Sequence, residues 1–220
     1  YEGFLTKAIL TSQKPDLRLL SLDLNLLPLR ECHHGHHHDD QHDHDHLKDS
    51  LYHYDPHVWL DPRYCQKLLK AMHGAFVKIF PHDKKYLDEN LKSALFDMDQ
   101  LYKELKQVFL PLKHKPFIVY HDGYQYLEKA FHLKGMPMLM NPDVPMTLSE
   151  HVKLQATLKK HLPSCVFLES QFPIKTLETF VQRYSLKTAV LDPMGIGLEG
   201  KEGYGILMTT LANTMKKCLL

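Results

Sequence analysis

The longest regular pattern in the chain is an amphipathic stretch that lies between Pro81 and Pro111. Across residues 83–110, apolar side chains recur at spacings of three and four and trace one stripe. A helix of this length would span about 42 Å, which is longer than most helices within one small domain. The pattern predicts a stiff helix joining two lobes, with an ordinary long surface helix or a coiled coil as the alternatives. The stripe comprises Leu87, Leu91, Ala94, Leu95, Met98, Leu101, Tyr102, Leu105, Val108 and Phe109.

A second amphipathic segment precedes this stretch. Apolar residues at helical spacing occupy residues 68–79. Asp61 can cap the N-terminus of this helix, with Pro62 at the first helical position. Further upstream, the sequence predicts a short helix over residues 4–10 and a strand over residues 17–22.

Short apolar strands alternate with helical segments from Pro111 to the end of the chain. Four strand–helix units in series imply an α/β fold, in which helices cover both faces of a parallel sheet. Ligands of such sheets bind outside the carboxyl ends of the strands. The expected strands are 117–120, 136–140, 165–168 and 188–191, and the expected helices are 124–132, 149–162 (capped by Ser149), 174–184 and 204–218.

The composition excludes some classes of partner. The net charge is +1 with histidine neutral, and no basic run or basic helix face is present, so nucleic acid is not an expected partner. No apolar stretch approaches the roughly 18 residues of a membrane span. The printed sequence starts at Tyr1 without a recognisable signal peptide, as we would expect of a mature or truncated product, and this start does not exclude export. None of the four cysteines forms a Cys-x-x-Cys pair, which argues against a zinc ribbon.

Residues 33–46 form a tract of histidine and aspartate that contains no residue suited to a core. Neutral imidazole is a good ligand for zinc, copper and nickel, so the tract indicates metal handling. An internal affinity tag and a solvated loop are the alternatives. A flexible tract lacks the fixed geometry of a closed site, so the tract is also consistent with weak, accessory binding. Its histidines are His33, His34, His36, His37, His38, His42, His44 and His46.

Three candidate metal ligands stand at the ends of predicted elements. His121 follows the first strand of the series, Asp192 follows the last, and His57 precedes the helix that starts near Asp61. Two imidazoles and a carboxylate are a suitable ligand set for zinc. Each residue alone would be weak support, because a histidine at a strand end is commonly structural and an Asp-Pro pair is commonly a turn.

These residues lie in motifs that resemble a known family. In chain order the motifs are Asp55-Pro-His-Val-Trp-Leu-Asp-Pro62, Val119-Tyr-His-Asp-Gly-Tyr-Gln-Tyr-Leu-Glu128, Cys165-Val-Phe-Leu-Glu-Ser-Gln-Phe172 and Leu191-Asp-Pro-Met-Gly195. With the His-rich insertion before the first motif, the whole chain resembles the metal-binding receptors of bacterial ABC importers for zinc and manganese, specifically the zinc-binding branch. The resemblance implies zinc capture at the cell surface or in the periplasm, and delivery to a membrane permease.

The resemblance also implies an architecture of two α/β lobes with parallel sheets, joined by one long helix, with the metal in the cleft. Residues 1–82, with the loop 33–46, would be the remainder of an N-terminal lobe, 83–110 the linking helix and 111–220 the C-terminal lobe. The fifty or so residues before His57 are too few for a whole lobe, so the first lobe is expected to be incomplete. A monomer is expected.

The resemblance assigns roles to particular residues. His57 would be a ligand from the first lobe, and His121 and Asp192 ligands from the second, with Glu169 and Asp122 close behind them. Manganese-binding relatives have glutamate where His121 stands, so Zn²⁺ is expected in preference to Mn²⁺. A fourth ligand would come from missing sequence, a loop histidine or water.

The same resemblance implies a bonding partner for two of the four cysteines and leaves the other two open. Members of the zinc branch can carry a disulfide between the positions of Cys165 and Cys218, which would imply an oxidising compartment. Cys32 and Cys65 have no counterpart in the family, and they would either pair or stay free.

Two other functions fit the same residues. In a zinc hydrolase, the two histidines, the aspartate and a water would form an open site with Glu169 as the general base, although no His-Glu-x-x-His motif is present. In a metal-storage or chaperone protein, the His-rich tract alone would bind the metal. On the family resemblance we expect a receptor that is not an enzyme, and the hydrolase and the storage protein are the alternatives.

Overall fold

The structure is a computed structural model that describes residues 55–120, 122–137, 147–161, 163–169, 181–196, 198 and 203–220. Four parallel strands form one sheet in the order β2-β1-β3-β4. The strands are β1 (Pro116–Val119), β2 (Lys134–Pro137), β3 (Cys165–Glu169) and β4 (Thr188–Leu191). The α/β fold with a parallel sheet is thus confirmed.

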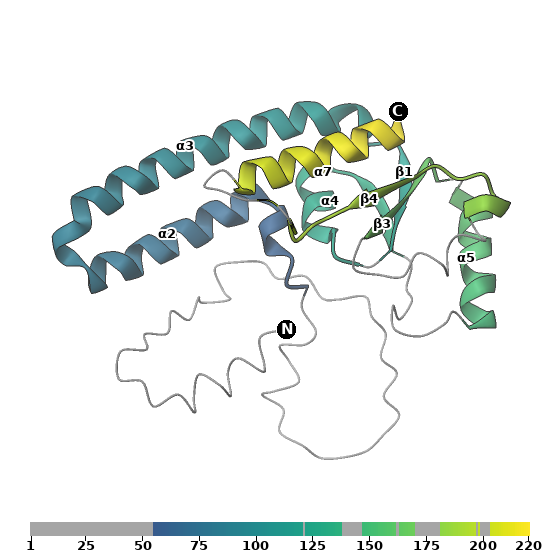
Figure 1. Ribbon diagram of the computed structural model, residues 1–220, viewed down its shortest axis with the longest axis horizontal. Coiled ribbons are helices and arrows are strands. Elements are labelled where there is room, and N and C mark those ends of the chain that lie inside the picture. The colour runs from purple at the N-terminus through teal and green to yellow at the C-terminus, as the bar shows by residue number, and fades with distance from the viewer. Residues whose placement is uncertain are drawn as a thin grey trace, which may run out of the picture.

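Helices flank this sheet, and two long helices extend away from it (Figure 1). The α-helices are α2 (Pro62–Ile79), α3 (Lys84–Phe109), α4 (Gln125–Phe131), α5 (Leu148–His161) and α7 (Gly203–Leu219). Short 3₁₀ turns are η3 (Val58–Leu60), η4 (Pro81–Asp83) and η5 (Leu110–Leu112). None of the helices among the described residues is long and apolar enough to cross a membrane.

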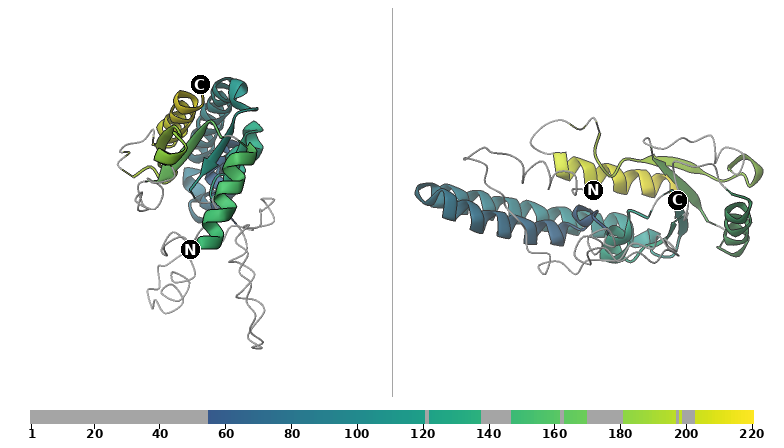
Figure 2. Two further views of the ribbon diagram at one scale, coloured as in Figure 1. Left: turned by 90° about the vertical axis from the view of Figure 1, so that its right-hand side faces the viewer. Right: turned by 90° about the horizontal axis from the view of Figure 1, so that it is seen from below.

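The strands alternate their side chains between two cores. Phe117 and Phe167 point into the larger core, which they share with α4, α7 and the C-terminal end of α3. Ile118 and Val166 point to the opposite face, where Leu154 and other residues of α5 cover them. Figure 2 shows α5 on one side of the sheet and α7 on the other. Helices therefore cover both faces, as the sequence predicts.

The long amphipathic stretch forms α3, whose ends lie within one residue of the expected 83–110. The helix runs beside α2, which η4 joins to it, and its C-terminal part also contacts α7 (Figure 1). Polar contacts tie α2 to α3: Gln66 Nε2 donates to Asp99 Oδ1 at 2.6 Å and to the Leu95 carbonyl at 3.5 Å, and His73 Nε2 lies 2.8 Å from Asp88 Oδ1. The helix is confirmed, and its contacts with α2 extend from Asp88 near its N-terminus to Asp99 beyond its middle.

Local signals predicted some element boundaries better than others. Asp61 does cap α2, because its carboxylate accepts the Arg63 N–H at 2.9 Å, and Pro62 is the first helical residue. The expected cap at Ser149 is wrong, since α5 already begins at Leu148. Strand β2 begins at Lys134, two residues before the expected start, because pairing with β1 extends the strand through Lys134 and Gly135. The elements expected at 4–10, 17–22 and most of 174–184 lie outside the described residues.

Candidate metal centre

His57 lies at the N-terminal boundary of η3, next to a buried carboxylate. Asp55 Oδ1 lies 2.6 Å from His57 Nδ1 and also accepts the His57 backbone N–H at 2.9 Å. An ionised carboxylate can only accept a hydrogen bond, so this geometry favours the imidazole tautomer with its proton on Nδ1 and its lone pair on Nε2. This carboxylate–histidine pairing is the arrangement that orients metal-binding histidines in proteins.

Asp55 is itself held in place by the core. Its side chain is fully buried, and its backbone carbonyl accepts a hydrogen bond from the Tyr126 hydroxyl of α4 at 3.0 Å. Within the described part of the chain, Asp55 Oδ2 is a buried side-chain atom that has no hydrogen-bond partner. A buried carboxylate oxygen without a donor is costly, and a cation bound nearby would offset that cost.

Asp192 follows β4 directly and shapes the turn after it. Its Oδ1 accepts the backbone N–H groups of Met194 at 3.1 Å and Gly195 at 2.9 Å. Gly195 has a φ of +68°, a conformation that glycine adopts at little cost. The turn therefore fixes the position of the Asp192 carboxylate at the carboxyl end of the sheet.

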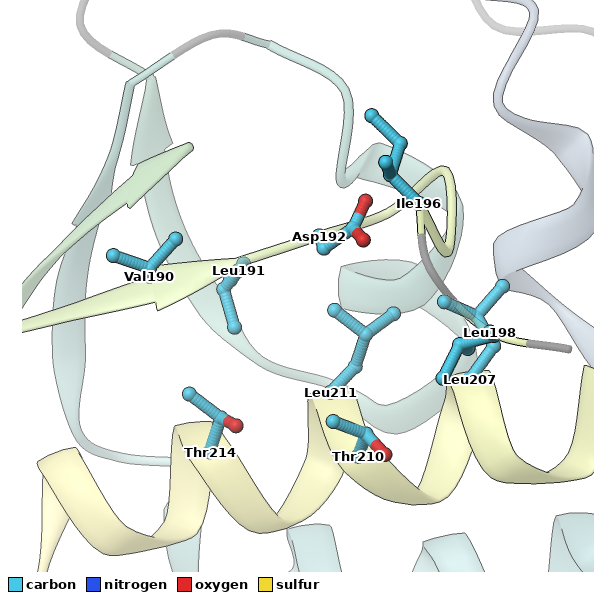
Figure 3. A pocket seen from close by; sticks show the side chains of 9 residues that line it. All are labelled: Val190, Leu191, Asp192, Ile196, Leu198, Leu207, Thr210, Leu211 and Thr214. Carbon is cyan, nitrogen blue, oxygen red and sulfur yellow. The ribbon is translucent and has the colours of Figure 1, made fainter. Parts of the chain in front are cut away.

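A cavity of about 220 Å³ lies between β4 and α7, with Asp192 among its lining residues (Figure 3). In Figure 3 the side chains of Thr210, Leu211 and Thr214 rise from α7 toward β4. The rest of the lining is mostly aliphatic and includes Ile196. Aliphatic side chains cannot bind a metal. The cavity therefore does not supply the further ligands that a metal bound by Asp192 would need.

Glu169 ends β3 and accepts a hydrogen bond from the Tyr124 hydroxyl at 3.2 Å. Both side chains are buried. Burial, together with the nearby carboxylates of Glu169 and Asp192, raises the pKa of Tyr124 well above its usual value. Tyr124 thus stays protonated and lies within electrostatic range of both carboxylates at the carboxyl ends of β3 and β4.

Asp122 is buried just before α4 and accepts a hydrogen bond from Gln125 Nε2 at 3.0 Å. The preceding residue, His121, lies outside the described residues, as do the eight histidines of the tract 33–46. Where the structure describes the chain, it brings no three His, Cys, Asp or Glu side chains into a group able to hold a metal ion. The set His57, His121 and Asp192 therefore stays a prediction.

Some residues of this region were not identified from the sequence. Asp55 belongs to the motif Asp55–Pro62, and its position two residues before His57 is a signal from which its role could have been predicted. Trp59 links the segment of His57 to that of Asp192, since its indole N–H donates to the Pro193 carbonyl at 3.0 Å. Tyr124 carried no such signal, because its contact with Glu169 depends on the folding of distant segments.

The cysteine pair that the resemblance implied is bonded in the structure. A disulfide joins Cys165 at the start of β3 to Cys218 near the end of α7. Cys65 is a free, partly buried thiol, and Cys32 lies outside the described residues. Burial raises the pKa of the Cys65 thiol, while a hydrogen bond with Tyr204 acts in the opposite direction.

The fold and its polar strand ends define the class: an α/β protein with the carboxylates of Asp122, Glu169 and Asp192 at or just beyond the carboxyl ends of parallel strands. More narrowly, the chain belongs to the ZnuA family, described as the periplasmic zinc-uptake complex component A, whose model matches residues 1–218. It is 33% identical over 168 residues to the high-affinity zinc uptake system protein ZnuA of Brucella abortus, covering 76% of this chain and 50% of that protein. The counterpart in Bacillus subtilis is 30% identical over 174 residues, covering 76% and 54%. The chain thus spans about half the length of these relatives.

Solved structures agree on the fold. The metal-dependent lipoprotein YcdH of Bacillus subtilis has a TM-score of 0.64 and 29% identity, covering 76% of this chain and 65% of that one. A crystal structure of ZnuA has a TM-score of 0.67 at 23% identity, covering 77% and 64%. The second likeness bears on the fold alone.

Proposed function

We propose that this protein captures zinc outside the bacterial inner membrane, in the periplasm or on a lipid anchor, and delivers it to the permease of an ABC importer. The membership in the ZnuA family supports this proposal, as do the names of the relatives. The structural observation that carries it is the 2.6 Å contact between Asp55 and His57, which presents Nε2 of the imidazole as a metal ligand. In this role the protein is a monomeric carrier and not an enzyme.

Zinc would be held by His57, His121 and Asp192. Two neutral imidazoles and one ionised carboxylate match the preference of Zn²⁺ for nitrogen and oxygen ligands, and they suit Mn²⁺ less well. Residues 1–82 would belong to one lobe and 111–220 to the other, with 83–110 joining them. Glu169 and Asp122 would neighbour the ligands without binding the metal directly.

The His-rich tract would serve as an accessory. Many weak sites close to a tight one raise the local zinc concentration without needing a single geometry. The tract 33–46 would therefore affect how fast zinc is gathered at low supply, while the tight site would lie with His57, His121 and Asp192.

A zinc titration in competition with a chelating dye tests this assignment in the full chain and in a variant that lacks residues 33–46. We expect one tight site to survive the deletion. His57→Ala, His121→Ala and Asp192→Asn should each weaken that site about 100-fold or more, equivalent to roughly 3 kcal/mol. His82→Ala is the matched control, because His82 is an exposed histidine in η4, away from the strand ends.

Two results would contradict the proposal. If all tight binding disappears with residues 33–46 and survives in His57→Ala, the protein stores or buffers metal through the tract. If zinc-loaded protein hydrolyses ester or peptide substrates with robust turnover that Glu169→Gln abolishes, the protein is a hydrolase and not a receptor.

A further inference from the structure

Trp59 makes a direct connection between the two described segments that carry the proposed ligands. It is the single tryptophan of the chain and lies in η3, two residues after His57. Its indole Nε1 donates a hydrogen bond of 3.0 Å to the carbonyl of Pro193, the residue that follows Asp192. One side chain thus joins segments that are 134 residues apart in sequence.

Further contacts hold Trp59 in this position. Its backbone carbonyl accepts a hydrogen bond from the Tyr204 hydroxyl of α7 at 2.7 Å, and Cys65 Sγ of α2 lies 3.5 Å from the same oxygen. The indole also lies against the His57 imidazole, with ring centroids 5.1 Å apart. The indole side chain is partly buried and packs against the larger core. Trp59 therefore has little freedom to release Pro193 without disturbing α2, α7 or His57.

This arrangement bears on metal affinity because a metal site needs its ligands at fixed relative positions. Neighbours that lock the ligands into place supply that precision, and losing one of them typically costs 10- to 100-fold in metal affinity. The indole N–H can only donate and Pro193 offers only its carbonyl, so Trp59 is always the donor of this hydrogen bond and Pro193 the acceptor. The turn of Asp192 is further braced by its own bonds to Met194 and Gly195.

We infer that Trp59 is a positioning residue, which clamps the His57 segment to the Asp192 turn and so sets the distance between these two ligands. This inference rests on the proposed zinc site. It adds that the affinity of the site depends on a side chain that does not touch the metal. Because Trp59 contacts the His57 ring, its fluorescence would also report occupancy of the site.

Trp59→Phe tests the clamp, because phenylalanine keeps an aromatic ring and removes the N–H donor. We expect zinc to bind about 10- to 100-fold more weakly, mainly through faster release. Bound Co²⁺ should show an altered visible absorption spectrum, since the carboxylate and the imidazole would no longer meet the metal in the same geometry. A loss of stability alone would leave that spectrum unchanged. Tyr204→Phe is the graded comparison and should have a smaller effect, because it removes one brace and leaves the indole bond.

Wild-type protein supplies a second readout that does not depend on the folding of any variant at Trp59. Zinc addition should change the Trp59 emission with the same midpoint as the dye competition, and His57→Ala should abolish the change. Wild-type emission that stays constant while zinc binds would overturn the inference, as would wild-type affinity and an unchanged Co²⁺ spectrum in Trp59→Phe. Either result would leave the proposed function intact as long as His57→Ala and Asp192→Asn still lose zinc. Wild-type affinity in those two ligand variants would instead overturn the proposed function.

Discussion

The sheet region (β1–β4 with α4, α5 and α7) and the α2–α3 hairpin (residues 62–109) bury their apolar residues very differently. Strand β3 is buried along its whole length, and seven residues of α7 are buried. In α3, which is 26 residues long, only Leu105 and Phe109 are buried, both near the end that meets the sheet region. Helical periodicity is strongest in the hairpin, yet burial is greatest in the sheet region. A regular apolar stripe therefore predicts a helix, but it does not show how deeply that helix packs.

The comparison also locates the proposed metal centre. His57 and Asp55 precede α2, where the hairpin leaves the sheet region, while Asp192 and Glu169 lie at the carboxyl ends of β4 and β3. The sheet region, which buries most apolar residues, thus carries Asp192 and Glu169. The Trp59–Pro193 hydrogen bond attaches the segment of His57 and Asp55 to this region.

The sharpest test of this comparison uses one substitution at two positions of α3. Leu105 is 2% exposed and belongs to the larger core, whereas Leu91 is only partly buried within the hairpin. Leu105→Ala should lower the free energy of unfolding by about 3 kcal/mol, since it leaves a cavity in a closed core. Leu91→Ala should cost about 1 kcal/mol, because its surroundings already contact solvent.

Urea denaturation followed by circular dichroism measures both effects. Helix propensity does not separate the two variants, because leucine and alanine are both strong helix formers and both positions are interior to the helix. Equal losses at Leu91 and Leu105 would show that the middle of the hairpin packs as tightly as its junction with the sheet region.

Local sequence patterns predict the elements of both regions but little of the contact between them. Runs such as Cys165–Leu168 and Thr188–Leu191 are short and apolar, and both became strands of the predicted sheet. Local rules failed at Ser149 and at the start of β2, where strand pairing and the onset of α5 decided the boundary. Propensity and spacing describe neighbours along the chain, and these boundaries depend on partners elsewhere.

The candidate site divides in the same way. His57 and Asp192 could be named in advance because they stand at the ends of elements, where α/β proteins bind ligands. The bond from Tyr126 to Asp55 joins residues 71 positions apart, and the bond from Trp59 to Pro193 joins residues 134 apart. No local pattern encodes such pairs. The residues that hold Asp55 and the Asp192 turn in place are therefore evident only from the three-dimensional arrangement.

A smaller difference in the free energy of unfolding is expected between substitutions at the two ends of the hairpin. Asp61 is buried and caps α2 through its bond to the Arg63 backbone, and it also accepts from the Arg63 guanidinium at 2.8 and 3.0 Å. Asp83 occupies the equivalent position before α3, but its side chain makes no capping hydrogen bond. Asp61→Ala should therefore cost about 1–2 kcal/mol, and Asp83→Ala about 0.5 kcal/mol or less.

Thermal and urea unfolding of the two variants check this difference. The Asp61 side chain is anchored at the sheet end of the hairpin, whereas Asp83 lies at the far end, so the result also compares these two ends. A loss at Asp83 as large as that at Asp61 would mean that a capping bond forms there in solution.

The smallest effect concerns alkaline pH and the groups buried where the hairpin meets the sheet region. Burial raises the pKa of the Cys65 thiol, and burial together with the neighbouring Cys65 raises the pKa of the Tyr204 hydroxyl. The unfolded chain loses these protons near the reference values of about 8.5 and 10, while the folded protein keeps them. The folded state then binds more protons than the unfolded chain. The stability that these two groups contribute is therefore fully present below about pH 8.5 and falls as the pH rises above about 8.5 and then above about 10.

Urea midpoints of the zinc-free protein between about pH 7.5 and 10 should show this fall in stability. Cys65→Ala should flatten its first part, and substitution of an exposed tyrosine, Tyr86→Phe, should leave it unchanged. A midpoint independent of pH in the wild type would show that these groups are open to solvent, and so that the junction is packed no better than the middle of the hairpin.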